Sequence, residues 1–363
     1  MNKSTKTIAG ASGDALGSSA RRSAADQQRG LMKYLVVGGG SMGKRRIRCL
    51  LASNVKSEQI RMVDMRADRQ AEVREKYNVD SLSDLDAGLE WNPDAVVVSV
   101  PGAAHMGVNL AAARRKKHVF CEVPLATSLD GVEELSKLVE QHKLIFAPGC
   151  QPPMHPLFKQ VKRWMGETEF GRTLCVIAEF GQYLPDWHPY EDYRKFYAAD
   201  QKMGGGNLDV IAQDLANFYW LLEDRATELF AAGHKVSSLE IMANDVWDIS
   251  AGTSKGTRMF LHFDLIQRAG RSMLRIISEN GTIELNMTEG AARRFLASTK
   301  QSETKSLPPG YVYEQCYIDE IGTFIGCIEG KAKWYNPLPT AIDVVKFLIA
   351  MQTSAETKTS VRI

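Results

Sequence analysis

A glycine-rich turn between an apolar strand and a helix constrains the fold of this chain more than any other feature. Residues 33–38 form a short apolar run ending in glycine, which predicts a buried parallel strand, and residues 41–53 follow with helical spacing. The turn between them, residues 38–43, has the pattern Gly-x-Gly-x-x-Gly. The next predicted strand, residues 59–64, ends in Asp64, 21 positions after Gly43. Strand, turn, helix and acidic residue in this order are typical of a dinucleotide-binding Rossmann unit.

Each residue of this turn has a defined role in binding a dinucleotide. Gly38 permits the tight turn, Gly40 lets the backbone approach the pyrophosphate, and Gly43 lets the helix pack closely on the strand. The first helical residues, Ser41 and Met42, present unpaired N–H groups to the phosphates. We therefore predict that this turn binds NAD(H) or NADP(H).

The choice between these cofactors depends on Asp64 and the arginines that follow it. A carboxylate at Asp64 accepts hydrogen bonds from the ribose hydroxyls and repels a 2′-phosphate, which favours NAD. Arg66 and Arg69 could instead pair with that phosphate. NAD is the first expectation, and NADP stays open.

The pattern of strands changes at about residue 149. Before it, predicted strands at residues 94–100, 118–122 and 144–147 alternate with helices, which indicates an α/β, doubly wound parallel sheet. After it, strands follow one another with few helices between them, at residues 174–182, 228–232, 245–252, 257–265, 272–278 and 282–286. Their succession, with hairpin chemistry at residues 279–281, predicts an α+β domain with a large, mostly antiparallel open sheet. Residues 204–220 start in glycines and are expected to become helical, and residues 340–354 are expected to form a helix.

We therefore predict three segments. Residues 32–149 form the Rossmann domain, and residues 150–363 form an α+β domain for substrate binding and oligomerisation. Residues 1–31 are rich in Ser, Ala, Gly and Gln and have almost no large apolar side chain, so a disordered extension is expected. Met32 directly precedes the first strand and would be a reasonable start of the protein.

Composition and charge exclude several classes of function. The formal net charge is +2, from 45 basic and 43 acidic side chains, which gives no field that would attract nucleic acid or an anionic membrane. No apolar run approaches the ~20 residues of a membrane-spanning helix. The six cysteines are scattered without CxxC spacing, so we expect buried thiols, no metal site and a cytoplasmic location.

Several motifs resemble those of the Gfo/Idh/MocA oxidoreductases, over about residues 33–363. Besides the glycine turn they are SVPGAAH at 99–105, HVFCEVPLA at 118–126, GGGNLDVIAQD at 204–214 and SENGTIEL at 278–285. The resemblance implies hydride transfer between NAD(P) and a hydroxyl-bearing carbon of a sugar, cyclitol or similar compound. It also implies that Pro101, His105 and Glu122 lie at the cofactor, and that the protein is a homo-oligomer, a dimer or tetramer formed through the open sheet.

The chain departs from the family pattern at two positions. In the family, the Lys of a Glu-Lys-Pro motif binds the reacting oxygen, and a His four residues after an Asp acts as acid or base. Here Val123 stands at the Lys position, and Gln213 follows Asp209 at the His position. Valine has no polar hydrogen, and a glutamine amide does not titrate near neutral pH.

Substitutes for the lost groups lie in a loop after the first strand of the second domain. They are Asp186, His188, Tyr190, Tyr193 and Tyr197. We predict that His188 or Tyr193 takes over proton transfer beside Asp209 and Gln213; alternatively, these aromatics only pack the loop against the sheet. Three functions follow: an oxidoreductase with atypical proton-transfer residues, a catalytically inactive or regulatory nucleotide-binding protein, or an enzyme that oxidises its substrate only transiently.

Overall fold

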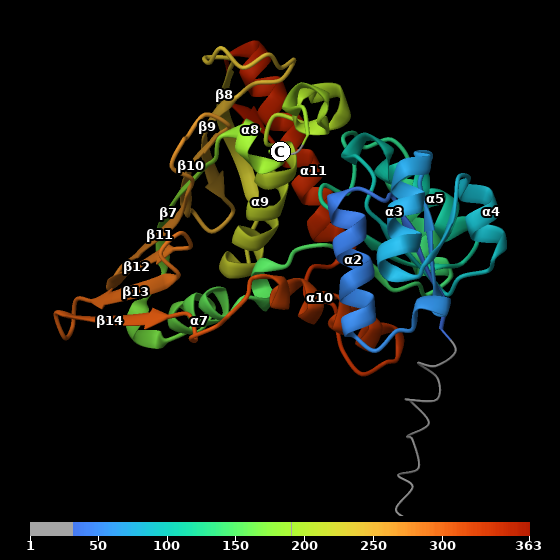
Figure 1. Ribbon diagram of the computed structural model, residues 1–363. Helices are drawn as coiled ribbons and strands as arrows, with labels where there is room; N and C mark the ends of the chain where they lie inside the picture. Colours follow the sequence, from blue (N-terminus) through green and yellow to red (C-terminus); the bar gives the residue numbers. More distant parts are fainter. Residues whose placement is uncertain (1–31, 190) are drawn as a thin grey trace, which may run out of the picture.

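The computed structural model describes residues 32–189 and 191–363, which build two sheets (Figure 1). The predictions made for residues 1–31 and Tyr190 lie outside the described residues. The first sheet has six parallel strands in the order β3-β2-β1-β4-β5-β6. These are β1 (Tyr34–Val37), β2 (Ile60–Val63), β3 (Asp80–Leu82), β4 (Ala95–Val98), β5 (His118–Cys121) and β6 (Phe146–Pro148). The predicted doubly wound parallel sheet is confirmed.

Burial explains which strands of this sheet could be predicted. Every residue of β1 and β4 is buried, because helices cover both faces of the sheet. These helices are α2 (Ser41–Ala52), α3 (Ala67–Tyr77), α4 (Leu85–Glu90), α5 (His105–Arg114) and α6 (Val132–Gln141). The edge strand β3 was not predicted, because its three residues are at most partly buried and form no apolar run.

The second sheet has nine strands in the order β14-β13-β12-β11-β7-β10-β9-β8-β15. Its neighbours are antiparallel except for the parallel pair β7 and β10, so the predicted mostly antiparallel sheet is confirmed. The strands are β7 (Thr173–Gly181), β8 (Ala226–His234), β9 (Val246–Thr253), β10 (Arg258–Asp264), β11 (Arg271–Ser278), β12 (Gly281–Asn286), β13 (Ala291–Leu296), β14 (Gln301–Ser306) and β15 (Val361–Arg362).

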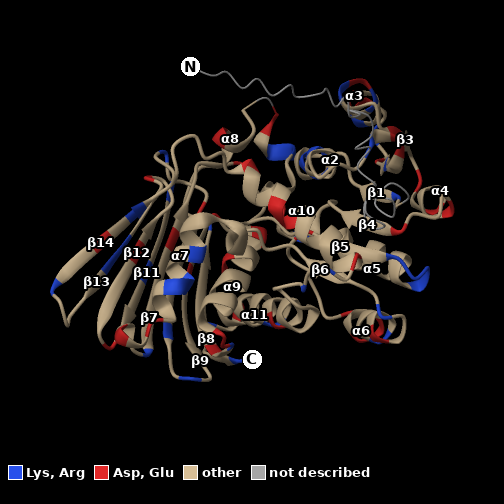
Figure 2. Ribbon diagram, turned by 90° about the horizontal axis from the view of Figure 1, so that it is seen from below, with Lys and Arg blue, Asp and Glu red and all other residues tan. Residues whose placement is uncertain are grey.

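Three helices cover one face of the second sheet, on the side of the first domain (Figure 2). They are α7 (Pro156–Met165), α9 (Leu208–Leu222) and α11 (Leu338–Thr357), and they share one apolar core with the strands. Helix α9 begins at Leu208, after the glycines that start the predicted segment, because Gly204, Gly206 and Asn207 have φ angles of 90°, 72° and 67° and form a turn. In the described part of the chain, no helix covers the opposite face (Figure 2).

Helix α10 (Glu314–Ile328) returns from the second sheet to the first domain and lies beside α2 (Figure 1). Its Ile321 and Phe324 are buried in one cluster with Ile47 and Phe120. Residues 338–345 of α11 likewise bury apolar side chains under the first sheet. A single domain over residues 150–363 therefore stays a prediction, since its last helices also complete the core of the first domain.

The six cysteines are free thiols in the structure. Five are buried and Cys175 is partly buried, as their scattered positions predicted. Within residues 32–189 and 191–363, no helix combines the length and the apolar character needed to cross a membrane.

Candidate active site

The glycine turn is closed around Gly38 and Gly43 but open above Gly40. Gly38 has a φ of 103°, and a Cβ built on it would lie 2.4 Å from the carbonyl oxygen of Ser99. A Cβ on Gly43 would lie 1.8 Å from the Gly38 carbonyl oxygen, so only glycine allows α2 to pack on the turn. A Cβ on Gly40 would approach nothing closer than Arg69, at 3.7 Å. The residues therefore fit a dinucleotide, whose pyrophosphate has room above Gly40 at the start of α2.

Asp64 is held by the turn and keeps acceptor capacity for a ribose. Its Oδ2 accepts the Gly39 N–H at 2.7 Å, and its Oδ1 accepts the Arg66 N–H at 2.8 Å. Oδ1 has a further lone pair for a ribose hydroxyl, whereas Oδ2 also faces Nη1 of Arg69. The Arg66 side chain pairs with Asp68 at 2.5 Å, whereas Nη1 of Arg69 lies 3.4 Å from Asp64. Arg69 rather than Arg66 is thus the cation beside the predicted ribose ligand.

The ends of β4 and β5 bring Pro101, His105 and Glu122 to the carboxyl edge of the parallel sheet. Pro101 is exposed there, and His105 is buried. The ring of His105 lies 2.6 Å from the Pro124 carbonyl oxygen through Nδ1 and 2.8 Å from the Val100 carbonyl oxygen through Nε2. Burial lowers the pKa of His105. His105 therefore ties the loop after β5 to the turn after β4, which positions the segment that contains Val123.

Glu122 belongs to a buried ion cluster that the sequence did not indicate. The Arg46 side chain is fully buried; its Nε donates to Glu122 at 2.5 Å, and its Nη1 lies 2.8 Å from Glu320 Oε2. Burial raises the pKa of Glu320, and the Arg46 charge opposes this shift. The cluster joins α2, the end of β5 and α10. A charged residue on the same helical face as Ile47 and Leu50 was the available signal for it.

Helix α9 carries Asp209 and Gln213 on one face, as predicted from their spacing. The Tyr197 hydroxyl donates a short hydrogen bond to Oδ2 of Asp209. Burial raises the pKa of Asp209, and burial together with the Asp209 charge raises that of Tyr197. Gln213 Oε1 accepts the side-chain N–H of Gln151 at 2.8 Å, and Gln151 also donates to the Tyr317 hydroxyl at 3.1 Å. The structure therefore adds Gln151 and Tyr317 to the predicted residues of this site, and of the predicted loop residues it brings Tyr197 to Asp209.

The two predicted proton-transfer residues, His188 and Tyr193, pack against residues other than Asp209 and Gln213. The His188 ring packs against Phe196 with centroids 4.7 Å apart, and burial lowers the pKa of His188. The Tyr193 hydroxyl accepts the backbone N–H of Glu240 at 3.4 Å, and its ring packs on the small cluster around Leu184. Their catalytic roles stay predictions, while Tyr197, from the same loop, is the residue that reaches Asp209.

Val123 does not leave an empty space at the lysine position of the family pattern. Its side chain is partly buried and packs against the apolar core of the second domain. An aliphatic side chain offers no hydrogen bond to a reacting oxygen. Any group that binds this oxygen must therefore come from elsewhere in the site.

Comparison with known proteins gives a family match over the first domain. Residues 32–150 match the Gfo/Idh/MocA model, which describes an oxidoreductase family with an NAD-binding Rossmann fold. The first domain of the chain is therefore similar to the NAD-binding domain of the Gfo/Idh/MocA oxidoreductases. Its first domain is thus an NAD-binding domain, in agreement with the open turn at Gly40 and with Asp64.

Relatives support this assignment at low identity. The chain is 25% identical over 201 residues to the uncharacterised oxidoreductase YrbE of Bacillus subtilis, and the match covers 54% of this chain and 56% of YrbE. It is 28% identical to myo-inositol 2-dehydrogenase of Thermotoga maritima, over 57% of this chain and 61% of that enzyme. Among solved structures, levoglucosan dehydrogenase in complex with NADH superimposes with a TM-score of 0.81 at 16% identity, covering 92% of this chain and 99% of that one. This last similarity shows the fold alone.

Proposed function

We propose that the protein is an NAD-dependent oxidoreductase that moves a hydride between the cofactor and a hydroxyl-bearing carbon of a sugar, cyclitol or related compound. The observation that carries the proposal is the Tyr197–Asp209 pair, which supplies a titratable group beside Gln213, where this chain lacks the histidine of the family pattern. The names of two relatives, an inositol dehydrogenase and levoglucosan dehydrogenase, support a polyhydroxylated substrate. NADP as an alternative cofactor stays open.

The residues of the chain divide the work of this reaction. Bound NAD supplies the hydride acceptor or donor. The turn at Gly40 holds the pyrophosphate, and Asp64 orients the ribose. The side chains of Gln151 and Gln213 offer amide groups to substrate hydroxyls, and Tyr197 with Asp209 offers a path for one proton.

A substrate panel tests this proposal. The protein is incubated with NAD or NADP and a set of polyols, cyclitols, uronates and nucleotide sugars, and the absorbance of the reduced cofactor is followed. We expect turnover with at least one compound, and none in a Gly40→Val variant whose pyrophosphate site is blocked. Calorimetry with NADH is run in parallel, so that silence on the panel can be separated from a failure to bind cofactor.

A second candidate, a catalytically inactive or regulatory NAD-binding protein, is favoured by one observation. Val123 packs into the core, and the Gln213 amide is engaged by Gln151, so neither position carries the family's chemistry. On this alternative, calorimetry shows tight NADH binding while no compound of the panel is oxidised or reduced.

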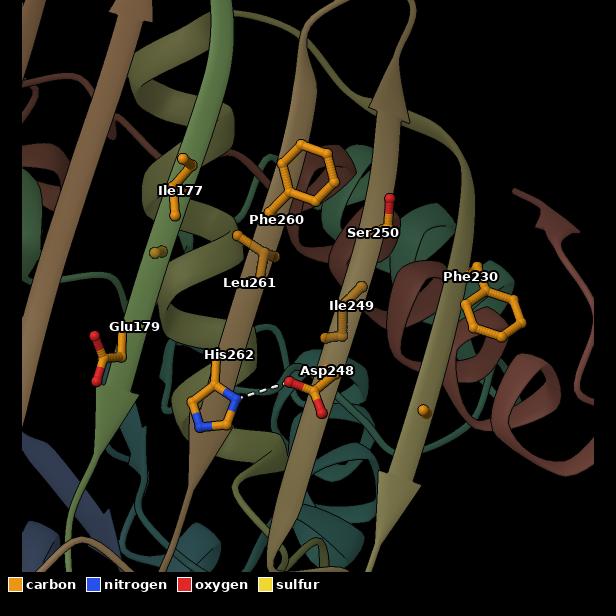
Figure 3. Close-up of a pocket in the computed structure, with 11 residues that line it drawn as sticks. Ile177, Glu179, Phe230, Asp248, Ile249, Ser250, Phe260, Leu261 and His262 are labelled. Atoms are coloured by element: carbon orange, nitrogen blue, oxygen red, sulfur yellow. Dashed lines mark hydrogen bonds and ion pairs between the residues drawn. The ribbon is translucent and has the colours of Figure 1, made fainter.

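We also propose that the protein is a homo-oligomer formed through the outer face of the second sheet. Ile177, Phe230 and Phe260 are 37%, 43% and 47% exposed there, around a hollow of about 500 Å³ (Figure 3). Exposed apolar patches on a sheet mark interaction surfaces. Light scattering should give a dimer or tetramer for the wild type and a smaller species for Phe260→Glu, whereas Val312→Glu, at a residue outside the sheet, should leave the mass unchanged.

A further inference from the structure

We infer that Tyr197 exchanges the proton with the substrate hydroxyl and that Asp209 is its partner in this transfer. The inference rests on the proposed function, since it assigns a residue to that reaction. It differs from the prediction for His188 and Tyr193, and it places the proton-transfer group on the loop before α9 rather than at Gln213.

The loop that carries Tyr197 is fixed to the start of α9. It consists of three short 3₁₀ helices, η5 (Tyr193–Lys195), η6 (Tyr197–Ala199) and η7 (Gln201–Met203). The Gly206 N–H donates to the Ala198 carbonyl at 3.0 Å. A Cβ on Gly205 would lie 2.4 Å from the Tyr197 carbonyl oxygen, so the glycine turn and the loop are in close contact. The position of Tyr197 relative to Asp209 is therefore fixed by these backbone contacts as well as by the hydrogen bond of its hydroxyl.

The same glycine turn places the pair at the cofactor edge of the first domain. A Cβ on Gly204 would lie 3.7 Å from the Cα of Gly102, in the turn after β4. Asp209 interacts electrostatically with His105, and Tyr197 with Glu122. Because dinucleotides bind across the carboxyl ends of strands in a doubly wound sheet, the pair faces the region where the reacting end of the cofactor lies.

The other titratable groups around the pair are already committed to protein contacts. Glu122 pairs with Arg46, and His105 has a carbonyl oxygen beside each ring nitrogen. The Tyr317 hydroxyl accepts from Gln151. Tyr197 differs from them because its hydroxyl donates to a carboxylate, which can take up the proton that the phenol releases.

In the oxidising direction the transfer balances as follows. The C–H bond of the substrate breaks, and oxidised NAD, when bound, would accept the hydrogen with its electron pair. The hydroxyl O–H bond breaks as the C=O bond forms, and this proton goes to the oxygen of Tyr197. The proton of Tyr197 goes to Oδ2 of Asp209. Burial raises the pKa of Asp209, which makes it a better proton acceptor than an exposed aspartate. Reduction runs the same steps in reverse.

Kinetics of matched tyrosine variants test the assignment. Tyr197→Phe removes only the hydroxyl, and Tyr183→Phe makes the same change at a ring that packs under Arg268. We expect Tyr197→Phe to lower kcat at least ~100-fold, the order of a general acid–base contribution, with KM and NADH affinity changed less than about threefold. Tyr183→Phe should keep the wild-type rate.

A spectroscopic readout tests the pair without turnover. In protein labelled with ¹³C at tyrosine Cζ, the Tyr197 resonance is assigned by its absence in Tyr197→Phe. We expect it to titrate with pH as Asp209 takes up a proton, with a midpoint above the ordinary value of ~3.9 for aspartate. Asp209→Asn should abolish this titration. A Tyr197 resonance that is indifferent both to pH and to Asp209→Asn would overturn the inference.

The kinetic outcomes separate the inference from the proposed function. If the wild type oxidises a panel compound and Tyr197→Phe keeps its rate within threefold, the inference fails and the proposed function stands. The same holds if Asp214→Asn, at the neighbouring aspartate of α9, abolishes the rate while Tyr197→Phe does not. If the wild type binds NADH and turns over nothing, the proposed function fails and the inference fails with it.

Discussion

The two domains keep the family pattern to different degrees on the two sides of the site. On the nucleotide side, a Cβ on Gly38 or Gly43 would clash with the turn, and Asp64 accepts the Gly39 N–H. On the substrate side, Val123 and Gln213 stand where the pattern has lysine and histidine. There, Val123 packs against the apolar core and Gln213 accepts a hydrogen bond from Gln151.

This difference reflects two kinds of chemistry. The glycines act through the absence of a side chain, and no residue elsewhere can restore a backbone that approaches a phosphate. Proton transfer needs one titratable atom in the right place, and any neighbouring loop can deliver it. A motif therefore identifies the nucleotide side more securely than the substrate side. The following predictions test this contrast, from the largest expected effect to the smallest.

The largest effect is expected at Arg46, the cation of the buried ion cluster that joins α2, the end of β5 and α10. Arg46→Met leaves Glu122 and Glu320 without their buried cation, and breaking such a pair costs ~3–5 kcal/mol of unfolding free energy. Arg48→Met is the matched control, because its ion pair with Glu314 is partly exposed and worth at most ~1 kcal/mol. Urea denaturation measures both. Equal losses in the two variants would contradict a role for the buried cluster.

Gly40→Val sharpens the contrast on the nucleotide side. A Cβ there meets no protein atom closer than 3.7 Å, so the fold should tolerate the change. The added side chain should, however, block the space that the pyrophosphate needs. We expect the Kd for NADH to rise at least ~30-fold, or ~2 kcal/mol, by calorimetry. Gly322→Ala, on the open side of α10, should leave the Kd unchanged. Unaltered binding in Gly40→Val would show that the cofactor does not approach this turn.

Asp64→Ala tests cofactor choice on the same side. It removes repulsion against a 2′-phosphate and frees Arg69, so the ratio of NADP to NAD affinity should rise ~10-fold, or ~1.4 kcal/mol. Asp68→Ala frees Arg66 instead and should change the ratio little. If Asp68→Ala shifts the ratio as far as Asp64→Ala does, Arg66 is the phosphate ligand.

The smallest effect concerns Asp214, on the substrate side. Burial raises the pKa of Asp214 to about 7, and the unfolded chain has the ordinary value of ~3.9. Between pH ~3.9 and pH ~7, Asp214 is deprotonated in the unfolded chain but still protonated in the folded protein. The unfolding free energy of the wild type therefore falls as pH rises towards 7. Because Asp214 keeps some contact with solvent, we expect Asp214→Asn to gain only ~1 kcal/mol over the wild type between pH 5 and pH 8. Urea unfolding of both proteins at pH 5 and pH 8 measures this gain. If the difference in unfolding free energy between the two proteins is the same at both pH values, Asp214 has no raised pKa.

The sequence predicted those parts of the molecule that are local and apolar. Strands β1 and β4 are continuous apolar runs because both faces are buried. Strand β14 is polar throughout and is formed by pairing with β13 at the sheet edge, so its own residues carry no signal. Helix α7 was not predicted either.

The substrate side of the site could be predicted only in part. Asp209 and Gln213 share a helical face, which spacing alone indicates. Tyr197 reaches Asp209 across 12 positions of loop without a periodic pattern, and Gln151 meets Tyr317 across 166 positions. Contacts of this kind depend on how the loop and α10 pack, which no local pattern encodes.

The return of α10 and α11 to the first domain has a consequence for synthesis. A nucleotide-binding domain made from an unbroken stretch of chain can fold as soon as that stretch leaves the ribosome. Here Ile321 and Phe324 fill one cluster under the first sheet, and Val345 fills another. The first domain to be translated is therefore among the last to be completed, and its exposed apolar surface must be protected until nearly the whole polypeptide has emerged.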